Sequence, residues 1–425
     1  MGRAAAAAAA YVHIPFCRRK CHYCDFAVHA IGSRHQRAAS TDSLMRGYAE
    51  GVCREVRATA RLQGAQGPLR TVYVGGGTPS LLPPPLLGRI LAELRASFGL
   101  ARDCHVTVEA DPATFDRRQL EALAAIGATR LSVGVQAFQD RLLTAAGRTH
   151  GVADVHSALS AVAASPFRDS WSLDLMFGLP HQTLPDWRQS LSRALAAAPP
   201  HLSAYGLTLE PDTPWGRSMT KGVAPLPRED TEVEMFELAH EMLTGAGYEH
   251  YEVSNFARPG QQSRHNWVYW EDRPFLGFGV GATSCDSNWR VRRPRNIRAW
   301  ERWVDRLEAG EGWGPELEGG AEWEAREAVD AVIAGMRTAR GVSLESLRRV
   351  ARSCGTPAAG AELRRGAPER GDPGGDDELR SLRAALRRWQ ASGRVRVEHE
   401  RVRLTAPSGF LVADDVTAEV WRALE

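Results

Sequence analysis

Short apolar segments alternate with longer amphipathic segments through the first half of the chain. The short segments are rich in β-branched or alternating apolar residues, which is typical of strands, and the longer ones have apolar residues at helical spacing. The predicted strands are 11–16, 71–74, 105–109, 130–135, 172–177 and 202–209, and the predicted helices are 43–62, 86–98, 117–125, 152–163 and 187–197. This alternation predicts an α/β fold with a parallel sheet, and its order favours a partial (β/α)6 TIM-like barrel.

The pattern becomes less regular after residue 225. We predict a helix over 231–245, a strand-like aromatic segment over 248–256, a glycine-rich strand and turn over 275–284, and helices over 322–337 and 344–351. Residues 353–377 consist largely of Gly, Pro, Arg and Asp, which predicts a disordered insert. A helix over 378–390, strands over 394–398 and 402–405 and a final helix predict a winged-helix-like arrangement.

These patterns divide the chain into five segments. They are an Ala-rich N-terminal tail (1–10), a barrel domain (11–225), a C-terminal region (226–352), the disordered insert (353–377) and the winged-helix-like tail (378–425). We expect the segments after the barrel to form a smaller α+β domain. Winged helices often bind DNA and this tail is rich in Arg, but acidic residues are interleaved and such modules also serve for docking, so no nucleic-acid partner is expected.

Length and charge limit the classes of function. A chain of 425 residues can bury a large core, and a formal net charge of +2 gives no general case for binding nucleic acid or a membrane surface. No apolar run is long enough to span a bilayer. Scattered cysteines at Cys53, Cys104, Cys285 and Cys354 fit a reducing compartment, so we expect a cytoplasmic protein. Arg3 followed by alanines leaves a mitochondrial or plastid location open if most of a presequence is missing.

The other three cysteines, Cys17, Cys21 and Cys24, follow the first predicted strand with the spacing C-x3-C-x2-C. Three thiols in one loop can bind an iron-sulfur cube and leave one iron without a protein ligand, which is where a substrate can bind. A zinc knuckle is the alternative, with His13, His22 or His29 as the fourth ligand. The residues of this loop alone do not exclude it.

This loop resembles the signature of the radical S-adenosylmethionine (radical SAM) superfamily. In that superfamily a 4Fe-4S cluster binds the amino and carboxylate groups of SAM and reduces its sulfonium, so the resemblance implies that Cys17, Cys21 and Cys24 bind the cluster. The segment Gly75-Gly76-Gly77-Thr78-Pro79, after the second predicted strand, resembles the motif that holds the methionine amino group of SAM. A triple glycine alone is a weak signal, because most such runs are turns.

Polar residues stand at or near the carboxyl ends of several predicted strands, where barrels carry their chemistry. Examples are Glu109, Gln136, Asp174 and Tyr205. A single such residue is usually a helix cap or a surface ion pair. Several ends of one sheet with polar groups suit a nucleoside that carries a sulfonium, and Arg148 can bind the carboxylate of SAM.

The motifs YVHIPFC, GGGTPS, EADP, GVQ, DL-x-x-GLP and HNWVYW together resemble the oxygen-independent coproporphyrinogen III oxidase-like branch of the superfamily, and most of all its haem-chaperone (HemW-like) subgroup. The resemblance extends over about residues 11–300. The residues that it places around SAM are Tyr11, Tyr23, Gly76, Gly77, Thr78, Glu109, Gln136, Arg148, Asp174 and, as a poorer match, Thr208.

Two features separate the chaperones from the oxidases of this branch. The oxidases carry a further cysteine where this chain has Phe26, and they have a substantial segment before the first strand, where only ten residues stand here. The motif His265-Asn266-Trp267-Val268-Tyr269-Trp270 resembles HNxxYW of the chaperones, which implies haem contacts from His265, Asn266, Tyr269 and Trp270. His265 can equally be a hydrogen-bonded core histidine, and Tyr251, His250 and Cys285 are other candidate iron ligands.

The resemblance therefore predicts a protein that holds a 4Fe-4S cluster, SAM and haem and delivers haem to acceptor proteins. The alternative is an enzyme that uses SAM to decarboxylate coproporphyrinogen III to protoporphyrinogen IX, and a third hypothesis is a scaffold without a cluster. The expected partners are SAM, haem or a porphyrin, a haem acceptor, and an electron donor such as flavodoxin or ferredoxin. Membrane association is expected only through an acceptor.

Overall fold

The structure is a computed structural model that describes residues 7–32, 39–64, 67–221, 226–286, 289–319, 321–354 and 380–424. Its chain forms two compact units. The first unit comprises Met1–Glu249, Ser254–Val268 and Pro274–Glu318, and the second comprises His250–Val253, Tyr269–Arg273 and Gly319–Glu425. In the described residues, no helix is both long enough and apolar enough to cross a bilayer.

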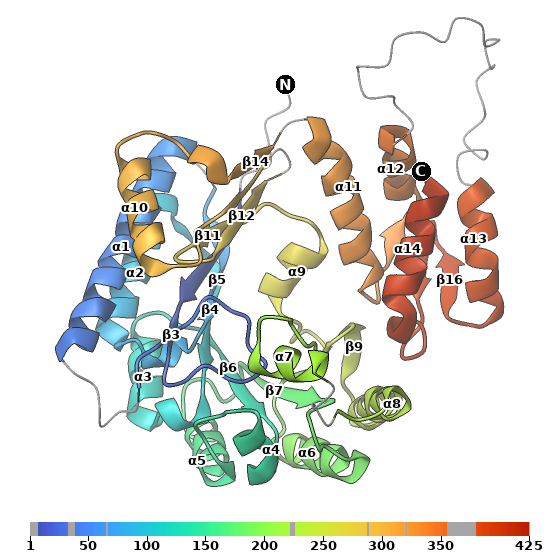
Figure 1. The fold of residues 1–425 in the computed structure, drawn as a ribbon, viewed down its shortest axis with the longest axis horizontal. Helices are drawn as coiled ribbons and strands as arrows, with labels where there is room; N and C mark the ends of the chain where they lie inside the picture. Colours follow the sequence, from blue (N-terminus) through green and yellow to red (C-terminus); the bar gives the residue numbers. More distant parts are fainter. Residues whose placement is uncertain are drawn as a thin grey trace, which may run out of the picture. The chain divides into compact units, whose positions relative to one another are not determined.

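A parallel sheet forms the centre of the first unit (Figure 1). Its six consecutive parallel strands are β1 (Ala9–Ile14), β4 (Leu69–Gly76), β5 (Leu100–Ala110), β6 (Arg130–Gln136), β7 (Trp171–Phe177) and β8 (His201–Gly206). β11 (Leu276–Phe278) pairs in parallel with β1, and β10 (Asn255–Ala257) pairs antiparallel with β8. Because neighbouring strands follow one another in sequence, the sheet has the order of a partial (β/α)6 barrel, and the predicted fold class is confirmed.

Helices connect these parallel strands. They are α1 (Ala39–Gln63), α2 (Pro84–Phe98), α3 (Arg117–Ala125), α4 (Asp140–Ala145), α5 (Val152–Ala163) and α6 (Leu184–Ala197). Local signals define several of their ends: Asp116 caps α3 by accepting a hydrogen bond from the Gln119 amide, and Thr183 and Asp186 form a capping box on α6. The bounds predicted for α3 and α5 are those observed, whereas α4 was not predicted because six residues carry too little periodicity.

Most of the segment from β8 to residue 318 belongs to the first unit, while 250–253 and 269–273 belong to the second. Its helices and strands are α7 (Pro214–Thr220), α8 (Glu229–Gly245), α9 (Arg264–Trp270), β12 (Thr283–Asp286), β13 (Trp289–Arg292), α10 (Ile297–Glu308) and β14 (Leu317–Gly319). α8 packs on α6 and β7, and α10 packs on α1. The predicted boundary at 225/226 therefore differs from the observed grouping, because long-range packing joins residues 226–318 largely to the sheet.

The second unit includes α11 (Ala321–Met336), β15 (Val342–Ser343), α12 (Leu344–Cys354), α13 (Arg380–Ala391), β16 (Val395–Glu398), β17 (Arg401–Leu404) and α14 (Ala413–Leu424). Its sheet has the order β15-β17-β16. This helix–strand–helix–helix–hairpin order is winged-helix-like and begins at α11, earlier than the predicted start at residue 378, because β15 pairs with β17. Most of the predicted disordered insert lies outside the described residues.

The first strand also begins earlier than predicted. Ala9 and Ala10 belong to β1 and are fully buried, although the sequence pattern placed them in an N-terminal tail. Their register with Thr71 and Val72 of β4 explains this, since the ladder with β4 extends before Tyr11.

Candidate functional site

A cavity of about 410 Å³ lies at the carboxyl ends of the parallel strands, where barrels carry their functional groups. Cys17, Cys21 and Cys24 all line it. The predicted SAM residues that line it are Tyr23, Gly76, Gly77, Thr78, Glu109, Gln136, Arg148 and Asp174. Tyr11, Thr208 and the residues predicted to bind haem are not among its lining residues.

The three cysteines reach one cavity because their loop closes on itself. The short strands β2 (Phe16–Cys17) and β3 (His29–Ala30) pair in parallel at the two ends of the loop. The His29 amide donates to the Pro15 carbonyl over 2.7 Å, and the Ile31 amide donates to the Cys17 carbonyl over 2.8 Å. The loop residues between these two bonds, which include Cys21 and Cys24, are thereby held beside Cys17.

Residues 145–147, at the end of α4, bind the cysteine loop through His22. The His22 amide donates to the Ala146 carbonyl over 3.0 Å, and His22 Nδ1 donates to the Ala145 carbonyl over 2.8 Å. A Cβ atom on Gly147 would lie 3.0 Å from the His22 ring, so only glycine leaves the ring its full space. The sequence pattern gave no sign of this support.

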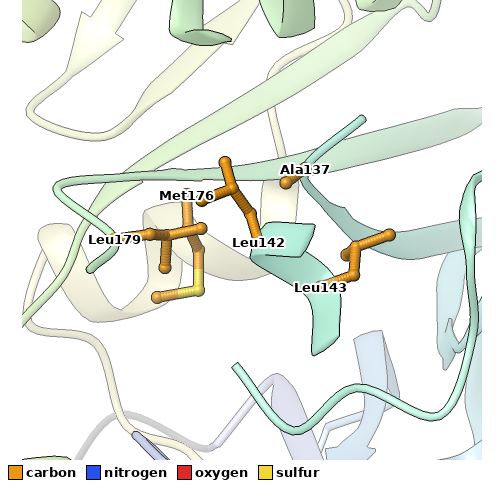
Figure 2. Close-up of a cluster of buried hydrophobic side chains, with 5 residues drawn as sticks. All are labelled: Ala137, Leu142, Leu143, Met176 and Leu179. Atoms are coloured by element: carbon orange, nitrogen blue, oxygen red, sulfur yellow. The ribbon is translucent and has the colours of Figure 1, made fainter. Parts of the chain in front are cut away.

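A hydrophobic cluster supports α4 in turn (Figure 2). Leu142 and Leu143 of α4 pack with Ala137, Met176 and Leu179, and all five are buried. The partly buried Tyr23 and Trp215 pack against the same cluster, with their ring centroids 5.9 Å apart. The cysteine loop is thus joined through Tyr23 to the core formed behind the ends of β6 and β7.

None of the three histidines considered as a fourth zinc ligand faces the cavity that the cysteines line. His13 Nε2 donates to the Ala27 carbonyl over 2.9 Å while its Nδ1 accepts from the Tyr11 hydroxyl over 3.0 Å. His22 is bound to Ala145, and neither it, His13 nor His29 lines the cavity. Among the described residues, no three His, Cys, Asp or Glu side chains lie close enough to share a single ion.

Burial favours the protonated form of the Cys17 and Cys24 thiols. Burial raises the pKa of the Cys17 thiol to about 12, against a hydrogen bond from the Thr78 hydroxyl over 3.6 Å that lowers it. Burial also raises the pKa of the Cys24 thiol. Cluster ligands are thiolates, so binding of iron would release these protons.

The glycines after β4 bring the backbone close to the cysteine loop. A Cβ atom on Gly77 would lie 2.7 Å from the Pro15 carbonyl oxygen and 2.9 Å from Cys17 Sγ. Gly76 has φ +114°, and a Cβ atom there would lie 2.6 Å from the His13 ring. Both positions therefore require glycine, because a side chain would collide with the neighbouring loop. A backbone without side chains can come close enough to bind a ligand through its own N–H and C=O groups.

Two carboxylates stand on neighbouring parts of the wall. Glu109 accepts from the Tyr73 hydroxyl over 2.8 Å and from the Gly76 amide over 3.1 Å, and burial raises its pKa to about 7. Asp174 accepts from the hydroxyls of Ser132 over 2.9 Å and Ser172 over 3.1 Å, and burial raises its pKa as well. Both groups are fixed in orientation and can accept hydroxyl hydrogen bonds from a ribose.

Arg148 connects this wall to the cysteine loop. One of its terminal nitrogens donates to Asp111 over 2.6 Å and to the Gly134 carbonyl over 3.0 Å, and the other donates to the Tyr23 hydroxyl over 3.2 Å and reaches Cys21 Sγ at 3.6 Å. Its Nε is buried and has no hydrogen-bond partner among the residues that the structure describes. A buried cation with an unused donor suits an anionic ligand group in the cavity.

Asp111 holds this arginine together with His150. The His150 ring lies between Asp111, 3.0 Å from Nδ1, and the Val135 carbonyl, 3.1 Å from Nε2. Burial would raise the pKa of Asp111, but Arg148 and His150 outweigh burial and hold it at about 2. The carboxylate is therefore ionised at neutral pH and paired with the guanidinium.

Gln136 carries a backbone conformation that is rare outside glycine. Its φ is +67°, and the pairing of β6 with β7 shifts register between Gly134 and Gln136. Left-handed residues at strand ends cost free energy and are common at functional sites. Here the shift ends the regular ladder and lets Gln136 line the cavity.

Four residues of the site were not identified from the sequence. Tyr73, Asp111 and Ser132 line the cavity, and His150 supports Asp111. Asp111 lies two residues after Glu109 in the EADP segment, and His150 lies two residues after Arg148 in the RTH segment. Their position in these motifs could have identified them. Tyr73 and Ser132 lie inside strands, and only the direction of their side chains distinguishes them from core residues.

The HNxxYW segment forms α9, and its first residue lies in the core of the first unit. His265 is 3% exposed, its Nδ1 lies 2.9 Å from Thr71 Oγ1, and its ring stacks on Tyr73 at 5.2 Å. Asn266 accepts from the Ser263 hydroxyl over 2.9 Å at the start of the helix. Of the two interpretations left open by the sequence, this geometry favours the hydrogen-bonded core histidine.

Comparison with known proteins identifies the family. The sequence matches the radical SAM superfamily over residues 11–194. It is 42% identical over 342 residues to a protein of Synechocystis sp. named heme chaperone HemW, and the aligned residues make up 80% of this chain and 81% of that protein. It is 38% identical over 272 residues to heme chaperone HemW of Escherichia coli, and the aligned residues make up 64% of this chain and 68% of that protein.

The solved structure of the coproporphyrinogen III oxidase HemN of Escherichia coli, a radical SAM enzyme, has the same fold. Its TM-score is 0.73 at 20% sequence identity, over 99% of this chain and 90% of that one. This likeness concerns the fold alone. Because the sequence identity to the HemW proteins is high over most of both chains, the chain belongs to the radical SAM superfamily and, within it, to the HemW family.

Proposed function

We propose that this protein is a haem chaperone that holds a 4Fe-4S cluster and SAM. The observation that carries the proposal is the convergence of Cys17, Cys21 and Cys24 with Gly77 and Arg148 on one cavity, in a chain whose relatives are named heme chaperones. Radical SAM membership implies the cluster and SAM. The haem function is inferred from the names of these relatives.

The cavity offers groups suited to both cofactors. The three thiols would hold the cluster, which supplies an electron to the sulfonium of SAM when both are bound. The backbone at Gly76 and Gly77 would bind the amino group of SAM, and Arg148 its carboxylate. Glu109 and Asp174 would accept hydrogen bonds from the hydroxyl or cationic groups of SAM, while Tyr23 and Gln136 would enclose it. Tyr11 supports this wall indirectly, since its hydroxyl donates to His13 and its ring stacks on Tyr73.

Haem contacts are proposed for Asn266, Tyr269 and Trp270 of the HNxxYW segment, each of which is partly exposed. Among the other candidate ligands, Tyr251 and His250 are buried, whereas Cys285 is partly exposed. Delivery of haem requires an acceptor protein, and reduction of the cluster requires an electron donor such as flavodoxin or ferredoxin.

The test is one anaerobic preparation examined in four ways. We expect about four iron atoms and four sulfides per chain after reconstitution, a Soret band on titration with haem, and transfer of that haem to an apoprotein acceptor. The same sample receives coproporphyrinogen III, SAM and a reductant. Formation of protoporphyrinogen IX would show that the protein is an oxidase and not a chaperone. A sample without iron and sulfide would support the third hypothesis, a scaffold without a cluster.

A further inference from the structure

His265 lies under a residue of the cavity wall. It contacts Thr71 and Tyr73. These two residues are two positions apart on β4, so their side chains face the same side of the strand. The His265 ring stacks on the Tyr73 ring at 5.2 Å with an angle of 26° between the planes, and its Nδ1 lies 2.9 Å from the Thr71 hydroxyl. The hydrogen bond to Thr71 fixes the orientation of the His265 ring, and the stacked His265 ring in turn restricts the orientation of the Tyr73 side chain.

Tyr73 connects His265 to the cavity wall through its hydroxyl group. Its hydroxyl donates to Glu109 Oε1 over 2.8 Å, while the Gly76 amide donates to Glu109 Oε2 over 3.1 Å. Glu109 and Tyr73 both line the cavity, whereas His265 does not. A chain of contacts therefore runs from the HNxxYW helix through one aromatic ring to a carboxylate of the wall.

We propose that His265 is a positioning residue of the SAM pocket, which acts by holding Tyr73 so that its hydroxyl orients Glu109. The inference rests on the assignment of SAM to this cavity and is independent of haem binding. The chemistry of the histidine fits such a role: burial lowers its pKa to about 3, so the ring is neutral and can stack without an unpaired buried charge. In this role His265 would couple the HNxxYW motif to the SAM site, although its own side chain would contact neither SAM nor haem.

The alternative is that His265 contributes only to the stability of the core. The two roles differ in one respect. If His265 only fills space, its loss lowers the unfolding temperature but leaves the affinity for SAM unchanged in the protein that remains folded. If it positions Tyr73, its loss and the loss of the Tyr73 hydroxyl remove the same hydrogen bond, so their effects on SAM affinity cannot add.

The experiment measures SAM affinity and thermal unfolding on the reconstituted full chain. We expect His265→Ala and Tyr73→Phe each to weaken SAM binding about five- to tenfold, the value of one ordinary hydrogen bond. The double variant should be no weaker than Tyr73→Phe alone. Trp267→Ala on the same helix is the matched control and should stay within about twofold of the unmodified protein.

A second readout and a second variant protect the test against misfolding. The Tyr73 hydrogen bond lowers the pKa of Glu109, so its loss in His265→Ala should move the pH midpoint of SAM binding upward. His265→Gln, which removes the ring but can still bond to Thr71, should show the same loss if the alanine variant does not fold. SAM affinity that stays within about twofold in the folded variants, or losses that multiply in the double variant, would overturn the inference.

Haem titration of the same variants separates this inference from the chaperone function. We expect the Soret band of His265→Ala to match that of the unmodified protein. A lost Soret band with unchanged SAM affinity would identify His265 as a haem contact and refute the positioning role. If the unmodified protein binds no haem, the proposed function fails while the SAM comparison still decides this inference.

Discussion

Arg148 and Asp111 form an ion pair over 2.6 Å in which both side chains are largely buried. The pair joins the segment after β5 to the segment after α4. Because the same guanidinium also reaches Tyr23 and Cys21, its orientation affects the cysteine loop and the SAM cavity together. The sequence suggested Arg148 as a ligand for SAM, and the structure adds the carboxylate that holds it.

Asp111→Asn should reduce the free energy of unfolding by about 3–5 kcal/mol, because Arg148 would keep its buried charge without an opposite charge beside it. We expect SAM affinity to fall as well, since the guanidinium is no longer held. Urea unfolding and SAM titration measure the two effects. Asp169→Asn removes an exposed ion pair with Arg168 and should change neither by a measurable amount. Equal effects of the two variants would contradict the role given to Asp111.

SAM affinity should increase with pH through about 7, the pKa to which burial raises Glu109. Above that pH the carboxylate is ionised and attracts the cationic groups of SAM, whereas below it the neutral acid does not. We expect about a five- to tenfold gain between about pH 6 and pH 8, measured by equilibrium dialysis. Glu109→Gln should bind SAM with little dependence on pH in this range; an unchanged pH profile would show that another group titrates.

The same carboxyl should affect stability in the opposite direction. Its pKa in the folded state lies above the unfolded value of 4.5, so the folded protein holds a proton that the unfolded chain loses between these values. The contribution is present below pH 4.5 and is lost as the pH rises towards about 7, with a total of at most about 3 kcal/mol. Urea unfolding of Glu109→Gln relative to the unmodified protein over this range measures the contribution, and a constant difference would refute it.

Gly77→Ala should prevent cluster assembly without unfolding the chain. The added Cβ would lie 2.7 Å from the Pro15 carbonyl oxygen and 2.9 Å from Cys17 Sγ, so the cysteine loop must move. We expect at least about a tenfold loss of bound iron after reconstitution, with unchanged circular dichroism. Gly47→Ala is the control, since nothing lies within 4 Å of its Cβ position in α1, and it should retain iron and gain up to about 1 kcal/mol.

Glu55→Gln should destabilise the first unit by about 3–5 kcal/mol. Glu55 and Arg293 form a fully buried ion pair over 2.8 Å, and Glu55 also accepts from the Gly279 amide and the Trp300 indole. The variant leaves a buried guanidinium without an opposite charge. Glu308→Gln, in a partly exposed pair with Arg54, should cost less than about 1 kcal/mol. Urea unfolding gives both values, and similar losses would contradict the importance of burial here.

The sequence by itself determined the features that depend on neighbouring residues. The bounds of α3 and α5 were predicted correctly because caps and periodicity are local signals. The six parallel strands followed from their alternation with helices. The spacing of Cys17, Cys21 and Cys24 was sufficient to place three thiols in one short loop, and the glycines after β4 marked a close backbone approach.

Only the tertiary structure decided which distant side chains meet. Asp111 and Arg148 are 37 residues apart, and Thr71 and His265 are 194 apart, so no local pattern records either contact. The sequence left open whether His265 lies in the core or contacts haem, because the burial of a histidine depends on which strand its helix packs against. Packing over long range also assigned residues 226–318 largely to the first unit, since the pairing of β11 with β1 is a property of the folded sheet and not of either strand.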